Sequence, residues 1–432
     1  MSWNVSYGLL IILSTIVTWG SATFLTPKTI ATPKEIRKNK LVLWACLIIN
    51  LGILFIYKYG NFFIISINDI SEGLNLGLKI NFLNVLLPVG ISFYTFQAIG
   101  YTIDVYNGTI KPEKDFFTYA LFVSFFPQLV AGPIERAKNL LPQFHTKHIF
   151  DDQKAMNGIQ MMVWGYFMKI CVADRAGLYV DAVYNNLAQH NGSSILLATF
   201  LFTIQIYCDF GGYSLIAIGV AKVMGFDLME NFHRPYFSTS IREFWKRWHI
   251  SLSTWFMDYV YIPLGGNRCS INRHMLNLFI TFLVSGIWHG ANWTFFIWGA
   301  YHGILICINS LWHKFGPKIT YYHKLHRIIN TLCTFCLIML GWILFRANSI
   351  VDISAIFIKI FKKSGNLFTG DLSNLKYVFV CIFILFTKDF LEGIGLMLLK
   401  KRIYSDIYIA VVFSFILFFG YFGTTQFIYF QF

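Results

Sequence analysis

The sequence predicts an all-α protein that crosses a membrane several times. Of its 432 residues, 56% are hydrophobic and only 13% are charged, whereas soluble globular domains are about 25% charged. Aromatic residues make up 19% of the chain, which suits lipid contact and the interfacial belts of membrane proteins. At about 20 residues per span, this length allows roughly ten spans with their loops.

Apolar stretches separated by polar loops predict the individual spans. The first is expected at about residues 7–24 and the second at about 41–57. The Lys- and Arg-rich loop between them is expected on the cytoplasmic side. Residues 61–81 are polar enough to lie outside the bilayer. Residues 275–311 are long enough for two helices or one long tilted helix. Other apolar stretches lie at about residues 156–172, 195–223, 328–345, 377–399 and 407–422.

Two apolar stretches, residues 82–106 and 122–144, contain proline and glycine. Pro88 and Gly90 predict a kinked or broken helix in the first. The second is interrupted by Pro127 and is too short to cross the bilayer cleanly. Non-helical backbone at membrane depth must be buried in protein or line a cavity. The second stretch is therefore predicted to be re-entrant.

No linker, low-complexity tract or repeat divides the chain, so residues 1–432 are interpreted as a single membrane-embedded domain. The net charge of +14 is assigned to cytoplasmic loops, or in part to an anionic ligand at that face, and not to nucleic acid. The cysteines fall mostly in apolar runs and indicate packing, not disulfides or metal binding. The first residues lack the basic region of a cleavable signal peptide and are interpreted as the first helix.

A basic, tryptophan-rich segment is the first candidate for a site. It contains Arg242, Lys246 and Arg247 close to His249. Such a segment lies at a membrane surface or lines a polar entrance. Its cations could bind the phosphates of a donor such as coenzyme A or a phosphopantetheine arm. The alternative is ordinary anchoring on the cytoplasmic side.

The second candidate is His289, in the apolar sequence VSGIWHGANWTFFIWG. A buried imidazole loses its water, so it is either tied into a helix–helix contact or required by a site. Gly290 is expected to leave room for a second molecule beside the ring. Asn292 is expected on the same helical face as a hydrogen-bond donor, and Trp288 as a pocket-lining side chain. Such a pocket could transfer acyl groups, with His289 as the base.

Several other chemistries have no signal in the sequence. The motifs GxxxxGK, HExxH, GxSxG and HxxxxD do not occur. An ion pump would place several carboxylates inside its spans. The few candidates, Asp104, Asp209 and Asp258, all fall near predicted helix ends or polar breaks. A non-enzymatic transporter or channel is therefore the weaker alternative.

Two blocks of sequence, REFWKRWHISLSTWFMDYVYIPLGGNR (residues 242–268) and SGIWHGANWTFFIWGAYHG (residues 285–303), resemble the membrane-bound O-acyltransferase family. The likeness is strongest to the branch of alginate O-acetyltransferase membrane subunits, which is related to the D-alanyl transferases of teichoic acid. It covers about residues 5–350, with a motif core at about 82–310. Three further blocks agree in order, at residues 87–106, 126–144 and 207–236.

The resemblance implies a ring of tilted transmembrane helices with re-entrant segments and a central funnel. It implies transfer of an acyl group, acetyl in the first place, from a cytosolic thioester such as acetyl-CoA toward an exported polysaccharide. His289 in the WHG motif and His249 in the RWHxSLS motif match the family's catalytic positions. His289 would act as general base or as an acyl relay.

The resemblance also implies partners and a location. No bound cofactor or metal is expected, because the thioester is a substrate. The expected partners are membrane lipid, the donor and a periplasmic or other extracytoplasmic acetyltransferase. The expected location is the bacterial cytoplasmic (inner) membrane. D-alanyl transfer from a carrier protein to teichoic acid is the nearest alternative.

The chain departs from the family pattern in three places. It begins one or two helices later than the family usually does. Leu215 stands where this branch often has Asp, so a role for that acid is not carried over. Roughly the last 80 residues show only generic apolar helices.

Overall fold

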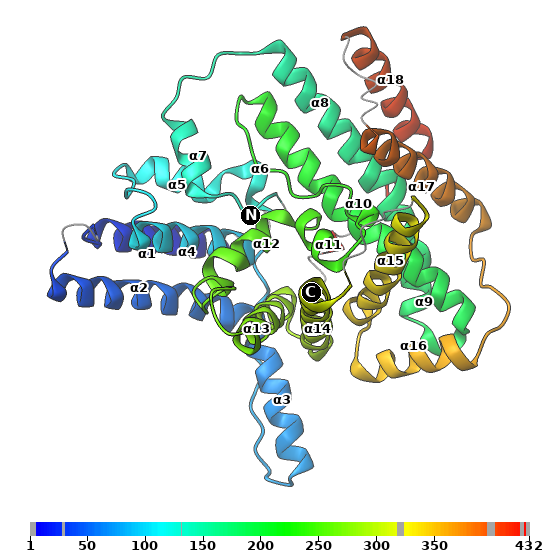
Figure 1. The fold of residues 1–432 in the computed structure, drawn as a ribbon, viewed down its shortest axis with the longest axis horizontal. Helices are drawn as coiled ribbons and strands as arrows, with labels where there is room; N and C mark the ends of the chain where they lie inside the picture. The colour runs from blue at the N-terminus through cyan, green and yellow to red at the C-terminus, as the bar shows by residue number, and fades with distance from the viewer. Residues whose placement is uncertain are drawn as a thin grey trace. The chain divides into compact units, whose positions relative to one another are not determined.

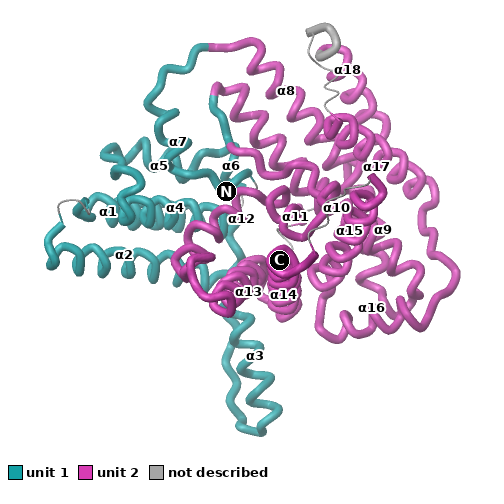
Figure 2. Tube along the Cα trace, in the orientation of Figure 1, with its two compact units in different colours: residues 1–149, 226–228 teal, residues 150–225, 229–432 magenta. Residues whose placement is uncertain are grey.

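The computed structural model describes residues 6–27, 31–130, 132–317, 324–394, 402–423 and 427–428. Throughout these residues the regular structure is helical, and they contain no strand. Five helices are long and apolar enough to cross a membrane, at residues 7–24, 33–73, 192–223, 293–315 and 324–346. The predicted all-α polytopic membrane protein is therefore confirmed. Two compact units make up the chain (Figure 2): residues 1–149 with 226–228, and residues 150–225 with 229–432.

The first unit is built from helices α1 to α7 (Figure 1). Their bounds are α1 Ser6–Phe24, α2 Pro33–Leu54, α3 Gly60–Gly73, α4 Ile91–Asn107, α5 Phe116–Ser124, α6 Phe126–Leu129 and α7 Ala137–Phe144. Polar side chains join these helices inside the unit: Ser14 donates to Asn50 at 2.6 Å, and Tyr119 donates to Thr18 at 2.7 Å. Such hydrogen bonds hold membrane helices together where the hydrophobic effect between them is weak.

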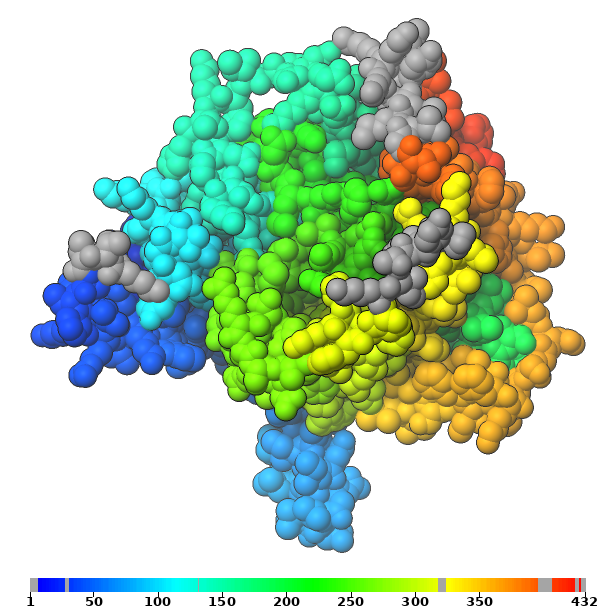
Figure 3. Space-filling model, viewed as in Figure 1, coloured from blue at the N-terminus to red at the C-terminus, as the bar shows by residue number. Residues whose placement is uncertain are grey.

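Helix α2 continues through a π-helical turn, Phe55–Tyr59, into α3. The sequence predicts that residues 61–81 lie outside the bilayer. In the structure, most of this stretch belongs to α3, a helix with apolar side chains. Ile65 and Ile70 of α3 are exposed, and Figure 3 shows this segment in blue with its side chains uncovered. Asn and Asp are interspersed among the isoleucines and phenylalanines of this stretch, and the prediction that it lies outside the bilayer stays a prediction.

The proline-containing stretches fold as separate short pieces. Pro88 and Gly90 do not kink a helix, because α4 begins only at Ile91, after Gly90 in a left-handed conformation with φ 78°. Residues 122–144 contain the end of α5, then α6 and α7, and Pro127 stands in the first turn of α6. Proline is tolerated there because its missing N–H has no intrahelical partner to lose. The predicted interruption of this stretch is confirmed.

The second unit holds the remaining helices. Their bounds are α8 Asp152–Tyr166, α9 Asp174–Tyr184, α10 Gly192–Val223, α11 Ile241–Arg247, α12 Ile250–Phe256, α13 Ile271–His289, α14 Trp293–Phe315, α15 Lys324–Arg346, α16 Ile350–Lys362, α17 Leu372–Gly393 and α18 Arg402–Phe419. Residues 275–311 thus form two helices, which decides between the two predicted alternatives.

Helices α8 and α10 lie side by side in the second unit (Figure 1) and approach closely at glycines. A Cβ on Gly158 would lie 2.6 Å from the carbonyl oxygen of Gly219, and one on Gly165 would lie 2.6 Å from that of Gly212. Each helix therefore places two glycines seven residues apart on the shared face. Small residues at such positions let membrane helices approach backbone to backbone.

Candidate active site

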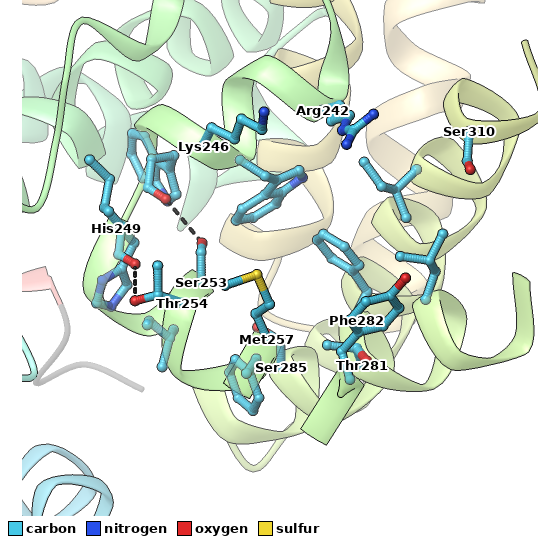
Figure 4. Close-up of a pocket in the computed structure, with 18 of the residues that line it drawn as sticks. Arg242, Lys246, His249, Ser253, Thr254, Met257, Thr281, Phe282, Ser285 and Ser310 are labelled. Atoms are coloured by element: carbon cyan, nitrogen blue, oxygen red, sulfur yellow. Dashed lines mark hydrogen bonds between the residues drawn. The ribbon is translucent and has the colours of Figure 1, made fainter. Parts of the chain in front are cut away.

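A cavity of about 570 Å³ lies in the second unit between α11, α12, α13 and α14. It has the size of a small-molecule site. Figure 4 shows its polar lining: Arg242 and Lys246 of α11 lie along one side, with His249 at one end and Ser310 of α14 toward the other. His289 also lines this cavity. Four of the residues singled out in the sequence therefore share one cavity.

The backbone at His249 separates α11 from α12. Ser240 caps α11 by accepting a hydrogen bond from the Glu243 N–H. The helix ends at Arg247, because Trp248 is extended, and His249 then takes a left-handed conformation with φ 44° before α12 begins. For a residue with a Cβ this conformation costs of order 1–2 kcal/mol. Strain of this kind clusters at functional sites.

The ring of His249 is 1% exposed and packs against two phenylalanine rings. Phe210 of α10 meets it edge-on with ring centroids 4.6 Å apart, and Phe232 is roughly parallel at 6.3 Å. Nδ1 of His249 lies 3.1 Å from the side-chain oxygen of Asn231. An amide oxygen can only accept, so Nδ1 carries the proton. The other nitrogen, Nε2, then has the lone pair that can accept one.

His289 is the last residue of α13 and is 5% exposed. Its ring packs edge-on against Trp288, Trp298 and Phe345, with centroids 4.9 to 5.4 Å away. The expectation that Gly290 leaves room for a second molecule is wrong. A Cβ on Gly290 would lie 2.1 Å from the Phe295 ring, so this glycine admits an aromatic side chain of the protein itself.

Close packing of α13 on α14 fixes where His289 stands. A Cβ on Gly286 would lie 2.4 Å from the carbonyl oxygen of Phe295, and one on Gly299 would lie 2.7 Å from that of Phe282. The two helices therefore cross with their backbones in contact. Three residues of the WHG-containing block, Gly286, Gly290 and Gly299, serve this crossing, which the sequence pattern alone does not reveal.

The indole of Trp288 lies close to both histidine rings. Its ring centroid is 5.0 Å from that of His289 and 6.2 Å from that of His249. Trp288 is 4% exposed and does not belong to the cavity lining itself. Trp288 thus connects His249 with His289, which are forty positions apart in the sequence.

Asn292 does not reach the cavity. It caps α14, where its side-chain oxygen accepts from the Thr294 N–H at 3.1 Å and its amide donates to the Asn348 carbonyl at 3.0 Å. The expectation that it shares a helical face with His289 is wrong, because α13 ends at His289 and Gly290 is extended. Asparagine at this position is a helix-capping signal.

The basic residues of α11 divide into two kinds. Arg247 pairs with Glu243 on the same helix and does not line the cavity. Burial raises the pKa of Glu243, but hydrogen bonds from Thr239 and the charge of Arg247 outweigh it, so the pKa of this carboxyl lies below its ordinary value. Within the part of the chain that the structure describes, Arg242 and Lys246 make no ion pair with a carboxylate. Their charges can therefore serve an anion.

Several site residues were missed in the sequence. Ser253 and Thr254 of α12 and Ser285 of α13 line the cavity with hydroxyl groups. Asn231, which holds His249, lies 18 residues before it in the chain. The available signal was the placement of Asn231 and both serines inside the blocks that carry the family resemblance.

Comparison with known proteins places the chain in a family. The model of MBOAT, the membrane-bound O-acyltransferase family, matches residues 113–351. The chain belongs to the membrane-bound O-acyltransferase family. It is accordingly a multi-pass membrane protein of an acyltransferase family, and both histidines lie within the matched residues.

Curated relatives in this family differ in the polymer their names mention. A probable alginate O-acetylase of Pseudomonas aeruginosa is 41% identical over 305 residues, covering 70% of this chain and 57% of the relative. A peptidoglycan O-acetyltransferase of Helicobacter pylori is 33% identical, with 81% of this chain and 69% of the relative covered. A teichoic acid D-alanyltransferase of Bacillus subtilis is 27% identical, with 61% and 69% covered. The chain spans about three fifths of the length of the alginate relatives.

Proposed function

We propose that this member of the membrane-bound O-acyltransferase family transfers an acetyl group from a cytosolic thioester toward an exported polysaccharide. The observation that carries the proposal is one cavity lined by His249, His289, Arg242 and Lys246. Imidazoles supply the proton transfer that acyl transfer to a hydroxyl requires. The two cations supply a place for the phosphates of a thioester donor.

In the proposed reaction, His289 acts as general base. Its neutral imidazole takes the proton of the acceptor hydroxyl while that oxygen attacks the thioester carbonyl. The carbon–sulfur bond breaks, and the leaving thiolate takes the proton from the imidazolium. His249 accepts a hydrogen bond through Nε2 from a neighbouring hydroxyl of the acceptor and so orients the reacting one. Ser285 lines the same cavity, and its hydroxyl would donate to the developing oxyanion.

The donor is proposed to be acetyl-CoA or another phosphate-bearing acyl thioester. Arg242 and Lys246 would hold its phosphates, while the thioester end reaches the histidines. Both cations lie on α11, with Lys246 about one turn and Arg242 about two turns before His249, the left-handed residue that caps α12. The proposed transfer needs no bound cofactor or metal, because the thioester itself supplies the activated acyl group.

Acetyl transfer is preferred over D-alanyl transfer because relatives named for acetyl transfer are 33% to 42% identical, against 27% and 30% for two teichoic acid D-alanyltransferases. We further propose that the protein resides in the bacterial inner membrane and hands its product to an extracytoplasmic acetyltransferase. A second candidate of another class, a transporter or channel without catalysis, has no support from the cavity, whose lining combines bases with hydroxyls.

The proposal is tested in the bacterial host by deleting the gene and complementing with the wild type or with His289→Ala. We expect deletion and His289→Ala to remove acetyl esters from the surface polysaccharide, with protein levels in the membrane unchanged. His148→Ala is the matched control, because His148 is exposed and outside the cavity. It should restore the esters fully.

The same strains separate the alternatives. Loss of alanyl esters with acetyl esters intact would replace acetyl by D-alanine as the cargo. Normal acetylation in the His289→Ala strain would contradict the catalytic assignment and favour a passive role. An acyl group that remains on the wild-type protein after donor removal, is released by hydroxylamine and is absent from His289→Ala would identify His289 as a covalent relay.

A further inference from the structure

Asn231 connects the segment before α11 to the turn that carries His249. It is 1% exposed. Its side-chain oxygen accepts from Nδ1 of His249 at 3.1 Å, and from the N–H and the hydroxyl of Ser251 at 3.3 Å and 2.9 Å. Its side-chain nitrogen donates to the Ser214 hydroxyl of α10 at 3.0 Å. Both ends of the amide are therefore used.

The hydrogen bonds on the two ends of the amide fix its orientation. If the amide were turned over, its NH₂ group would face the N–H of Ser251, and two donors would meet. The oxygen must therefore face Ser251 and His249. As a result, the proton of the neutral His249 ring stays on Nδ1 and the lone pair stays on Nε2.

The backbone around His249 is held by the same segment. The N–H of Ile250 donates to the Asn231 carbonyl at 2.9 Å, and the N–H of His233 donates to the Arg247 carbonyl at 2.9 Å. These two bonds lie on either side of the left-handed residue His249. They stabilise a conformation that would otherwise cost free energy, and so a single segment sets both the backbone and the tautomer of this histidine.

We propose that Asn231 is the positioning residue of the site: it holds His249 in the tautomer and orientation that let Nε2 accept a hydrogen bond from a hydroxyl of the acceptor next to the reacting one. This inference rests on the proposed function, because it assigns the role of Asn231 through His249. A partner that fixes a histidine's tautomer in this way is worth about 10- to 100-fold in activity at metal sites, and we expect a loss of that order here.

The charges near His249 bear on its pH dependence. From α10 it meets Phe210, whose neighbour Asp209 is paired with Lys169. From α13 it faces Trp288. The titratable and charged groups that line the same cavity are Arg242 and Lys246 of α11, Tyr261 after α12, and His274 and His289 of α13. Asn231 contributes a neutral acceptor, so replacing it by a carboxylate adds one negative charge beside Nδ1.

The test uses membranes from the deletion strain carrying the full-length chain, with radiolabelled acetyl-CoA as the probe and acetyl incorporation measured from pH 5 to pH 9. Asn231→Ala should lower kcat about 10- to 100-fold with the KM for the donor unchanged. Asn231→Asp keeps an acceptor at Nδ1 and restores part of the rate. Its carboxylate stabilises the imidazolium and raises the pKa of His249 from about 3, where burial holds it, so the variant should lose activity at the acid end of this range, where the wild type keeps it.

Two controls make each outcome decisive. Asn374→Ala removes a buried asparagine at the start of α17, which contacts Arg175 and not the cavity, and should leave the pH profile unchanged. His249→Ala tests the proposed function itself. If His249→Ala is inactive while both Asn231 variants keep the wild-type kcat and pH profile, the inference is wrong. If His249→Ala is fully active, the proposed role of His249 is wrong, and the inference about Asn231 falls with it. Should Asn231→Ala not accumulate, the pH shift of Asn231→Asp decides.

Discussion

At the scale of single residues, the position of His289 depends on the glycine that follows it. Gly290 has an extended backbone, which any residue can adopt. A glycine is needed here because it has no Cβ, and not because of its backbone conformation. The Phe295 ring occupies the place where a Cβ would stand. The sequence predicted a site at His289 but assigned the empty space beside Gly290 to a ligand, because nothing local shows that Phe295 folds back over it.

Replacing this glycine should therefore damage both stability and activity. Gly290→Ala forces the Phe295 ring aside, and overpacking of this kind costs about 1 to 3 kcal/mol. We expect a lower midpoint of thermal unfolding in detergent and reduced acetyl incorporation. Gly20→Ala is the matched control, because a Cβ there meets nothing within 4 Å. Equal unfolding midpoints for the two variants would refute this packing argument.

At the scale of elements, the sequence predicted helices well and their ends poorly. Long apolar runs in the sequence predicted α1, α10 and α15 close to their observed bounds. The break between α13 and α14 was left open, since residues 290–292 lie within a continuous apolar run. Capping by Asn292 decides it. Helix pairing was also invisible, because α10 is apolar on all sides and its sequence marks no single contact face.

The glycine contacts of α8 and α10 lead to a prediction about this pair. Gly165→Ala places a Cβ 2.6 Å from a carbonyl oxygen of the backbone of α10, so the helices must separate. We expect destabilisation by about 1 to 3 kcal/mol, read as a lower unfolding midpoint in detergent. Gly52→Ala in α2, where nothing lies within 4 Å of the added Cβ, should unfold like the wild type. A Gly165→Ala protein as stable as the Gly52→Ala protein would argue against close contact of the two helices.

At the scale of the molecule, the composition fixed the membrane class and the motif blocks pointed to the family. What they could not give is the convergence of His249 and His289 on one cavity, because that depends on the crossing of α13 and α14 and on Trp288, whose ring lies close to both imidazoles. Asn231 escaped notice for the same reason: its partners lie 17 to 20 residues away in the chain.

The central claim is that the two histidines serve one chemical step. It is tested most directly by measuring acetyl transfer for His249→Ala, His289→Ala and the double variant, with donor in excess and equal amounts of protein. Groups that act as a unit lose activity together, so removing the second costs little more than removing the first. We therefore predict that the double variant is no slower than the slower single variant. Losses that multiply in the double variant, or a single variant with wild-type activity, would contradict the account.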